Sequence, residues 1–273
     1  MHVESAAPST QPSSPLNAPR FLVAVSLILA AASWNARGQA STTAPGSEGL
    51  REPKTITVPF IEAKIKIDGE LTEYPWKRAP HLTPFNHYDT SASARVKTDV
   101  QIWYNREALY LGWNVEDADI QATLRKRDSK FWDEEVVEFF ITPKALDRYF
   151  EFQWNPLGGT FDAIIRNKLA PDGKSQKFDG DWSYTATNMA WALQVEGSVQ
   201  DSSDRDRRWI VEVRIPFADM NVRTPKRGEV WRGNFYRFNR DKGKEPELLS
   251  WSPVVWPGFH QPTRFGYLRF SGE

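Results

Sequence analysis

One short stretch of the chain, residues 131–141, concentrates residue types that could do chemistry. It reads Phe-Trp-Asp-Glu-Glu-Val-Val-Glu-Phe-Phe-Ile, so a tryptophan and four carboxylates lie beside a run of large apolar residues. The second half has the composition of a buried β-strand, and the carboxylate of Glu138 lies inside it. Burying a carboxylate costs several kcal/mol unless it is paired or hydrogen-bonded. Glu138 is therefore predicted either to pair with a buried arginine, such as Arg166 or Arg237, or to face a ligand site.

The composition limits the classes of function. The 35 Lys and Arg residues balance the 35 Asp and Glu residues, which argues against nucleic acid as the main partner because that partner needs a basic face. Cysteine is absent, so disulfides and thiolate metal sites are excluded. The 12 tryptophans exceed what one core usually needs. Some are therefore predicted to be exposed and to stack on a ligand.

The amino terminus differs from the rest of the chain. Residues 1–40 are predicted to be a signal peptide with an unusually long lead, because the apolar run 21–32 is too short to span a bilayer. Small residues at Gly38 and Ala40 predict cleavage after Ala40. Residues 41–54 are then expected to be a flexible linker. The protein is expected to be exported, either secreted or periplasmic, with no membrane span after cleavage.

The remaining residues, 55–273, are predicted to form one all-β domain. Apolar and polar residues alternate with a period of two in many short segments, of which 96–104 and 109–115 have the pattern of a hairpin. A short helical turn is expected within residues 71–79, and a loop is expected to lead from Pro171 to Trp182. No long amphipathic helix is predicted. The pattern is that of an antiparallel β-sandwich, immunoglobulin-like or jelly-roll-like, with one or two short helical turns.

An ordered set of motifs resembles the family 9 carbohydrate-binding modules and their relatives. The matching segments are, in chain order, Ile67–Leu71 with Trp76 and Ala79, Trp132–Glu134 with Val137–Phe140, Glu151–Pro156 with Gly158 and Asp162, Trp209–Glu212 with Ile215–Phe217, Gly228–Phe235 with Arg237, Trp251–Pro253, and Phe265–Gly266. They cover roughly residues 55 to 271. The resemblance implies a β-sandwich that is related more distantly to the haem- and sugar-binding sandwich domains of the DOMON type.

The resemblance also implies a site in which two tryptophans clamp a terminal sugar ring while polar side chains bond its hydroxyls. By motif position, Trp132 and Glu138 match one tryptophan and one carboxylate of that site. Trp256, in a loop with Pro257 and Gly258, is the candidate for the second tryptophan. The other predicted ligand-binding residues are polar residues on strands: Arg166, Arg237 and Asn239.

Each of these residues also has a structural interpretation. Trp132 could be a lid over the edge of the sheet, and Arg237 with Asn239 could form an internal polar network. Geometry limits the sugar-binding interpretation, because residues 132–138 would span roughly 20 Å if they were extended. Trp132 and Glu138 can therefore share one ligand only if the chain bends near Asp133 and Glu134, as β-bulges beside sites do.

Structural calcium is a further implication of the resemblance. Members of the family often bind this ion, and carboxylates are the hard oxygen ligands that it prefers. No calcium-loop spacing is present, so no cofactor is required by the sequence. The candidate ligands are four acidic residues: Asp117, Asp119, Asp133 and Glu134.

Three functions compete. The first is non-catalytic binding of mono-, oligo- or polysaccharide ends by an exported monomer linked to carbohydrate catabolism. The second is a glycan-active hydrolase, which would need two carboxylates about 5 to 10 Å apart. The third is a haem-binding electron-transfer domain, for which the mature chain offers only Met189 and Met220 as methionine ligands. Sugar binding is the interpretation that the motifs favour, and the chain is not expected to be an enzyme.

Overall fold

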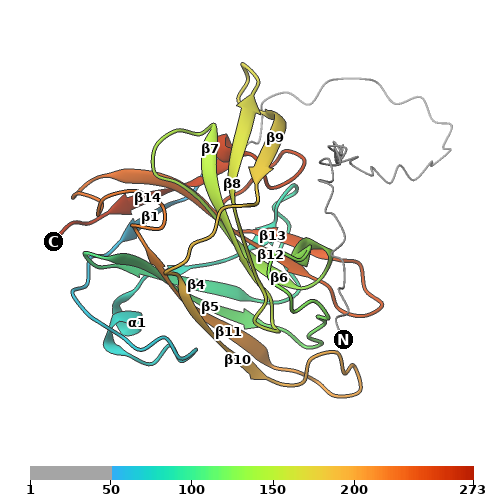
Figure 1. Ribbon diagram of the computed structural model, residues 1–273. Helices are drawn as coiled ribbons and strands as arrows, with labels where there is room; N and C mark the ends of the chain where they lie inside the picture. The colour runs from blue at the N-terminus through green and yellow to red at the C-terminus, as the bar shows by residue number, and fades with distance from the viewer. Residues whose placement is uncertain (1–50) are drawn as a thin grey trace, which may run out of the picture. The chain divides into compact units, whose positions relative to one another are not determined.

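Figure 1 shows the computed structural model of the chain, which describes residues 51–273. Two β-sheets packed face to face form this part of the chain. Neighbouring strands are antiparallel throughout, except for the parallel pair of the first and last strands. The predicted antiparallel β-sandwich is therefore confirmed.

The larger sheet supplies the surface on which the candidate site lies. Its strands follow the order β1 (Thr55–Val58), β14 (Gly266–Phe270), β12 (Val230–Asn239), β6 (Val136–Thr142), β7 (Arg148–Trp154), β8 (Thr160–Leu169) and β9 (Ser175–Asp181). Outside this order, β13 (Glu247–Ser250) pairs with both β12 and β3 (Asn86–His87).

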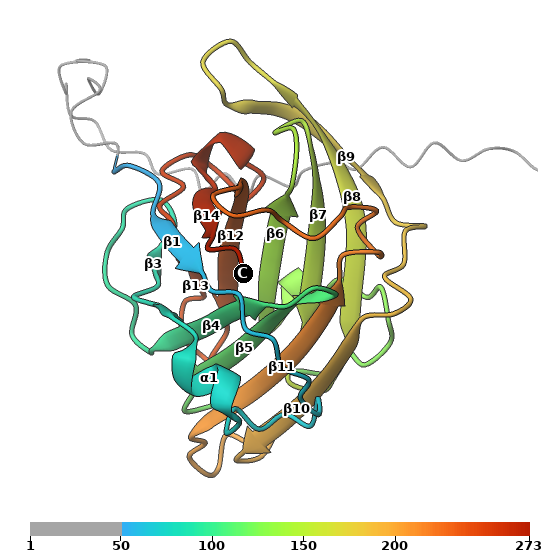
Figure 2. The same cartoon turned by 90° about the vertical axis from the view of Figure 1, so that its left-hand side faces the viewer.

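The smaller sheet covers one face of the larger one, and its strands run across those of the larger sheet (Figure 2). Its order is β10 (Ala190–Glu196), β11 (Arg208–Pro216), β5 (Ala108–Glu116), β4 (Thr98–Tyr104) and β2 (His81–Leu82). Three short helical segments complete the fold: α1 (Tyr74–Arg78), η1 (Phe131–Asp133) and η2 (Pro262–Arg264).

The main core lies between the two sheets and follows from the alternation in the sequence. Val137, Phe139 and Ile141 point from β6 into this core, where Phe139 stacks on Phe235 of β12 with ring centroids 4.6 Å apart. The intervening residues of β6 must point to the opposite face, because successive side chains of a strand alternate. Glu138 is therefore on the outer face of the larger sheet, away from the smaller sheet.

The predicted helical turn forms and buries its tryptophan. Trp76 of α1 is 1% exposed and packs edge to face on Trp103, on the outer side of the smaller sheet. Its indole N–H donates to the carboxylate of Glu212 (3.0 Å), which also accepts from the backbone N–H of Gly69 (2.9 Å). Gly69 has a φ of +85°, which glycine adopts readily, so this turn depends on its residue type.

A second apolar cluster lies on the outer face of the larger sheet. It includes Phe140, Tyr149, Phe161 and Tyr236 from the strands, and Phe259 from the chain between β13 and β14. Phe259 stacks on Tyr236 with ring centroids 4.2 Å apart. The outer face is thus partly covered by this connecting segment, and its remaining surface lies over β6 to β9.

Strand β9 departs from the sequence prediction. The loop expected between Pro171 and Trp182 contains strand β9, which pairs antiparallel with β8 at the edge of the sheet. The prediction failed because β9, with the sequence Ser-Gln-Lys-Phe-Asp-Gly-Asp, has no fully buried residue. Backbone hydrogen bonds to β8 hold it, and they leave no apolar pattern in the sequence.

The amino-terminal predictions can be placed only in part. The signal peptide, residues 1–40, lies outside the described residues, as does most of the linker, residues 41–54. Lys54 is described, and its backbone N–H donates to Ser252 Oγ at 3.1 Å, so the linker has ended by this residue. Within residues 51–273, no helix is long and apolar enough to cross a membrane.

Candidate functional site

The chain bends between Trp132 and Glu138. The helical turn η1 ends at Asp133, and a bend over residues 134–135 precedes β6. The segment is therefore not extended, so the condition set by the sequence for a shared ligand is met. Trp132 lies at the start of this bend, and Glu138 lies on the outer face of the strand that follows it.

Trp132 belongs to an aromatic trio. Its ring centroid is 5.7 Å from Phe161 of β8 and 6.0 Å from Trp182, and Trp182 is 5.4 Å from Phe161. All three contacts are edge to face, an arrangement that aromatic rings prefer. Trp132 is partly buried, whereas Trp182 is 48% exposed. Trp182 therefore presents a large apolar surface to solvent at the edge of the sheet.

A glycine determines where the Trp182 ring lies. A side chain at Gly180 would overlap atoms Nε1 and Cδ1 of the indole. The ring is therefore folded back over β9, toward the outer face of the sheet. Because Gly180 has ordinary strand geometry, the requirement for glycine comes from this close contact rather than from the backbone.

Three polar side chains lie beside the aromatic trio, on the same face of the sheet. Glu138 of β6 is directly opposite Gln153 of β7, and Gln153 is in turn opposite Phe161 of β8. Gln153 donates from Nε2 to Glu151 Oε1 at 2.6 Å. Glu138, Glu151 and Gln153 are 2%, 4% and 1% exposed. We call these three residues the polar trio.

The two acids of the polar trio have raised pKa values, and its amide has an oxygen without a partner. Burial, with the neighbouring charge of Glu151, raises the pKa of Glu138 well above its ordinary value, and no hydrogen bond opposes this. Burial also raises the pKa of Glu151 to about 8. The Oε1 atom of Gln153 is buried and has no hydrogen-bond partner. A native structure rarely leaves such a group without a partner, so the trio has the properties expected of a polar ligand site.

The structure places Arg237 and Asn239 elsewhere. Both are fully buried, on the face of β12 opposite to Tyr236. Arg237 donates to Asp117 Oδ2 (2.8 Å), to Asn239 Oδ1 (2.5 Å) and to the backbone carbonyl of Glu116 (2.8 Å). Neither side chain has surface left for a sugar. The internal polar network, the alternative stated for them from the sequence, is what the structure shows.

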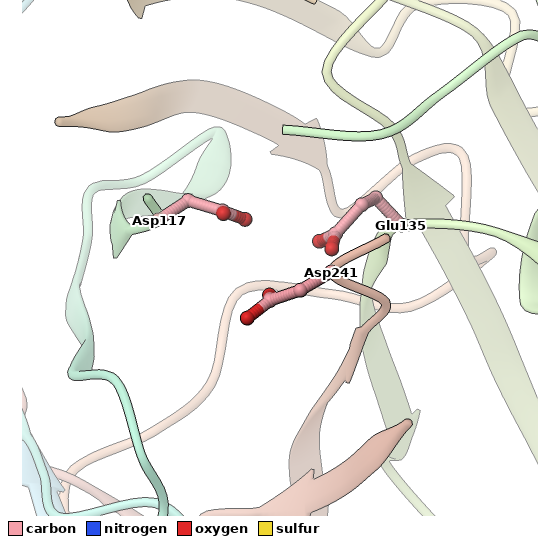
Figure 3. A group of neighbouring side chains, drawn as sticks. All are labelled: Asp117, Glu135 and Asp241. Atoms are coloured by element: carbon pink, nitrogen blue, oxygen red, sulfur yellow. The ribbon is translucent and has the colours of Figure 1, made fainter. Parts of the chain in front are cut away.

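Three carboxylates converge on this network. Figure 3 shows the side chains of Asp117, Glu135 and Asp241 gathered around one point. One carboxylate oxygen of each lies within 4.8 Å of those of the other two. Five of the six oxygens already accept a hydrogen bond, and only Glu135 Oε2 lacks one. Arg237 also lies 3.9 Å from Glu135. The set fits a network neutralised by arginine better than a calcium site, which needs six to eight free oxygen ligands.

The four predicted calcium ligands are not brought together. Only Asp117 belongs to the convergent carboxylates. Both carboxylate oxygens of Glu134 are used by the loop at Thr123, including the backbone N–H at 2.7 Å, and these bonds lower the pKa of Glu134. Asp119 accepts from Gln121 (2.6 Å), and Asp133 is the exposed end of η1. Calcium binding stays a prediction, which a calorimetric titration with calcium would test.

Arg166 and Trp256 do not join the aromatic trio. Arg166 is opposite Asp179 in the β8–β9 register. Ala163 and Ile165 of β8 are on the outer face, so Arg166 is on the other face of the strand and points away from Trp132. Trp256 lies near Lys174, whose ammonium is 5.5 Å from the ring. Lys174 precedes β9 and Trp182 follows it, so the backbones of these two residues are on the order of 25 Å apart. Trp256 therefore lies outside the aromatic trio, in which Trp182 is the tryptophan that contacts Trp132.

A family model matches most of the β-sandwich domain. The model of the family described as carbohydrate-binding family 9 matches residues 85–270. The chain belongs to carbohydrate-binding family 9. Members of this family are non-catalytic modules, in agreement with the expectation that the chain is not an enzyme. No curated protein sequence matches the chain.

Solved structures share the fold of this family 9 chain. A Bacteroides uniformis protein, assigned as a carbohydrate-binding protein, has a TM-score of 0.58 at 20% identity, over 80% of this chain and 100% of that one. A family 9 module from Caldicellulosiruptor kristjanssonii in complex with cellotriose has a TM-score of 0.55 at 15% identity, over 81% and 95%. Its complex with glucose has a TM-score of 0.53 at 15% identity, over 81% and 97%.

Two parts of the candidate site were missed in the sequence. Glu151 and Gln153 alternate with apolar residues in β7, and this period of two could have placed them on one face. Their position opposite Glu138 needed the strand register, which no local pattern gives. Trp182 gave no signal, because the edge strand before it is polar.

The two methionines considered for haem lie in the main core. Met189 is 7% exposed and Met220 is 3% exposed, and both pack among apolar side chains. They fill the sandwich instead of lining an open site. The structure therefore adds nothing in favour of the haem-binding alternative.

Proposed function

We propose that this family 9 chain binds the end of a saccharide without catalysis, at the aromatic trio and the polar trio. The observation that carries the proposal is the position of an exposed tryptophan, Trp182, against Trp132 and beside three buried polar side chains. A sugar offers apolar C–H faces, which stack on aromatic rings, and hydroxyls, which need donors and acceptors. The two trios supply both kinds of partner on one face of the sheet.

The spacing of the two tryptophans bears on how a sugar would enter. A ring held between two parallel indoles needs about 7 to 8 Å between their centroids, because each contact takes about 3.5 to 4 Å. Trp132 and Trp182 are 6.0 Å apart and nearly perpendicular. The two rings therefore do not form a parallel clamp, and the proposed sugar stacks on the exposed part of the Trp182 ring. The 48% exposure of Trp182 leaves this surface open.

Calorimetric titration with a panel of neutral mono- and oligosaccharides tests the proposal. We expect at least one sugar to bind, and Trp182→Ala to weaken it at least tenfold, or about 1.4 kcal/mol. Trp191→Ala is the matched control, because Trp191 is also partly exposed (38%) but belongs to β10 of the smaller sheet. Absence of binding to every sugar, or equal affinities for wild type and Trp182→Ala, would contradict the proposal.

Export and a role in carbohydrate catabolism are part of the same proposal. Their support is the sequence pattern of residues 1–40 and the membership in family 9. Amino-terminal sequencing of the protein from culture medium or periplasm should give Ser41 as the first residue. An intact residue 20–32 segment in that material would contradict export by cleavage. The expected monomer is checked by the mass of the purified protein in solution.

A further inference from the structure

The two carboxyl groups of the polar trio have neither a cationic partner nor a hydrogen bond from a backbone N–H. Two other buried acids without an ion pair, Glu212 and Asp206, each accept from backbone N–H groups instead. Asp117, Asp162 and Glu247 each form an ion pair with an arginine. Among the described residues, no ion pair includes Glu138 or Glu151. Proteins seldom bury a carboxylate without a partner, because the cost is several kcal/mol.

The groups that surround this pair do not neutralise it. Tyr149 of β7 and Tyr236 of β12 share the outer face, and burial raises the pKa of both phenols, so both stay uncharged. Burial lowers the pKa of His260, above β6 and β7, to about 3, so this imidazole is neutral as well. The apolar cluster of the outer face therefore supplies no cation to the two acids. Arg232, on the same face of β12 as Tyr236, donates instead to the backbone carbonyls of Phe265 and Thr263.

A cation beside Trp132, Arg240, is engaged with the aromatic side of the site. Arg240 follows β12, and its Nη2 donates to the backbone carbonyl of Trp132 at 2.9 Å. Its guanidinium lies 5.6 Å from the centroid of the Phe238 ring. Burial and Glu151 alone shift the pKa of Glu138, so Arg240 does not compensate for it.

We propose that the polar trio recognises a protonated amine, so that the preferred ligand is an amino sugar. This inference rests on the proposed function and names the class of its ligand. An ammonium group carries three N–H donors and no acceptor. The trio offers three acceptors in a row across β6 and β7: the carboxylates of Glu138 and Glu151, and the unpartnered Oε1 of Gln153. Charge-assisted hydrogen bonds of this kind are about twice as strong as neutral ones.

Proton release gives the proposal a second signature. In the free protein the two carboxyls hold protons at neutral pH, because burial raises their pKa values. An ammonium ligand stabilises the charged carboxylates and expels these protons into solvent. A neutral sugar with the same ring gives no such release. Binding of an amino sugar is therefore expected to become tighter as the pH rises from about 6 to about 7.

The experiment compares oligomers of glucosamine, N-acetylglucosamine and glucose of equal length by calorimetric titration. Each titration is run in two buffers with different ionisation enthalpies, which reveals proton release. We expect the glucosamine oligomer to bind at least tenfold tighter than either neutral oligomer and to release protons. Glu138→Gln and Glu151→Gln should each remove most of this preference while the glucose oligomer loses less affinity, because the amide keeps the size of the side chain.

The control and the outcomes separate this inference from the proposed function. Glu62→Gln changes an exposed acid that pairs with Arg106, and it should leave the preference unchanged. Tighter or equal binding of the neutral oligomers overturns the amine proposal alone. Absence of binding by all three oligomers overturns the proposed function as well. Thermal unfolding of each variant verifies that it is folded.

Discussion

At the scale of residues, two groups of buried acids differ in whether a cation neutralises them. Asp117, Glu135 and Asp241 converge at one end of the sandwich, where Arg237 donates to Asp117 and faces Glu135. The polar trio on the outer face has no such cation. A neutralised network is what a structural role requires, and an acid pair without a partner suits a site that a ligand completes. The difference lies in partners, since both groups are buried.

Arg237→Ala tests the structural role of the inner network. We expect it to lower the free energy of unfolding by about 3 to 5 kcal/mol, because it leaves buried carboxylates without their cation. Chemical denaturation measures this change. Arg106→Ala removes an exposed arginine that pairs with Glu62 and Glu273, and it should cost about 1 kcal/mol or less. A similar small cost for both variants would show that Arg237 is not the stabilising cation of the network.

At the scale of elements, strand β9 decides how much of the site could be predicted. The motif from Trp132 to Glu138 was recognisable, because its residue types and spacing are local. The hairpin of β4 and β5 was equally clear from its period of two. Strand β9 gave no such pattern, since its pairing with β8 rests on backbone hydrogen bonds, which every residue type except proline can donate. The sequence therefore indicates Trp256, in a loop beside Lys174, as the second tryptophan, and gives no indication of Trp182.

Gly180→Ala tests whether β9 holds Trp182 in place for binding. The added methyl would occupy the space of the indole, so the ring must leave its position over the strand. We expect sugar affinity to fall about tenfold, as for Trp182→Ala, while the free energy of unfolding changes by about 0.5 kcal/mol or less, because Trp182 is half exposed. Calorimetric titration and chemical denaturation measure the two effects.

A double-mutant cycle gives the control for this element. If Gly180→Ala acts only through Trp182, it should have no further effect on affinity in the Trp182→Ala background. Additive losses would show instead that the alanine disturbs the β8–β9 pairing itself. Unchanged affinity in Gly180→Ala alone would contradict a role for the ring position.

At the scale of the whole molecule, the sandwich uses one sheet for stability and leaves part of the other for binding. The smaller sheet buries one face of the larger sheet. Helix α1 covers the outer side of the smaller sheet with Trp76. On the outer face of the larger sheet, the segment between β13 and β14 covers Tyr236 and Phe140 but not Trp182. The polar trio therefore lies between a covered region and an exposed edge, where a ligand can complete its hydrogen bonds.

This arrangement predicts how the stability of the ligand-free protein depends on pH. The pKa of Glu151 rises from 4.5 to about 8 on folding, so between these values the folded state holds a proton that the unfolded state has lost. Its contribution to stability is complete below about pH 4.5 and is lost as the pH rises toward 8. Each such carboxyl lowers the free energy of unfolding by at most about 1.4 kcal/mol per pH unit.

Chemical denaturation at about pH 6.5 and pH 8 measures this effect together with that of Glu138 and Glu135, because burial raises the pKa of both carboxyls well above their ordinary value. The pKa of His260 falls to about 3, so its contribution changes only below its ordinary value of 6.5. The pKa of Lys54 falls from 10.5 to about 8, so its contribution changes only above that pH. We expect Glu151→Gln to reduce the loss of stability between the two pH values, because its amide does not titrate, whereas Glu62→Gln should lose as much as wild type. An equal loss in Glu151→Gln would mean that Glu151 is ionised in the folded protein, and a ligand would then find its carboxylate already charged.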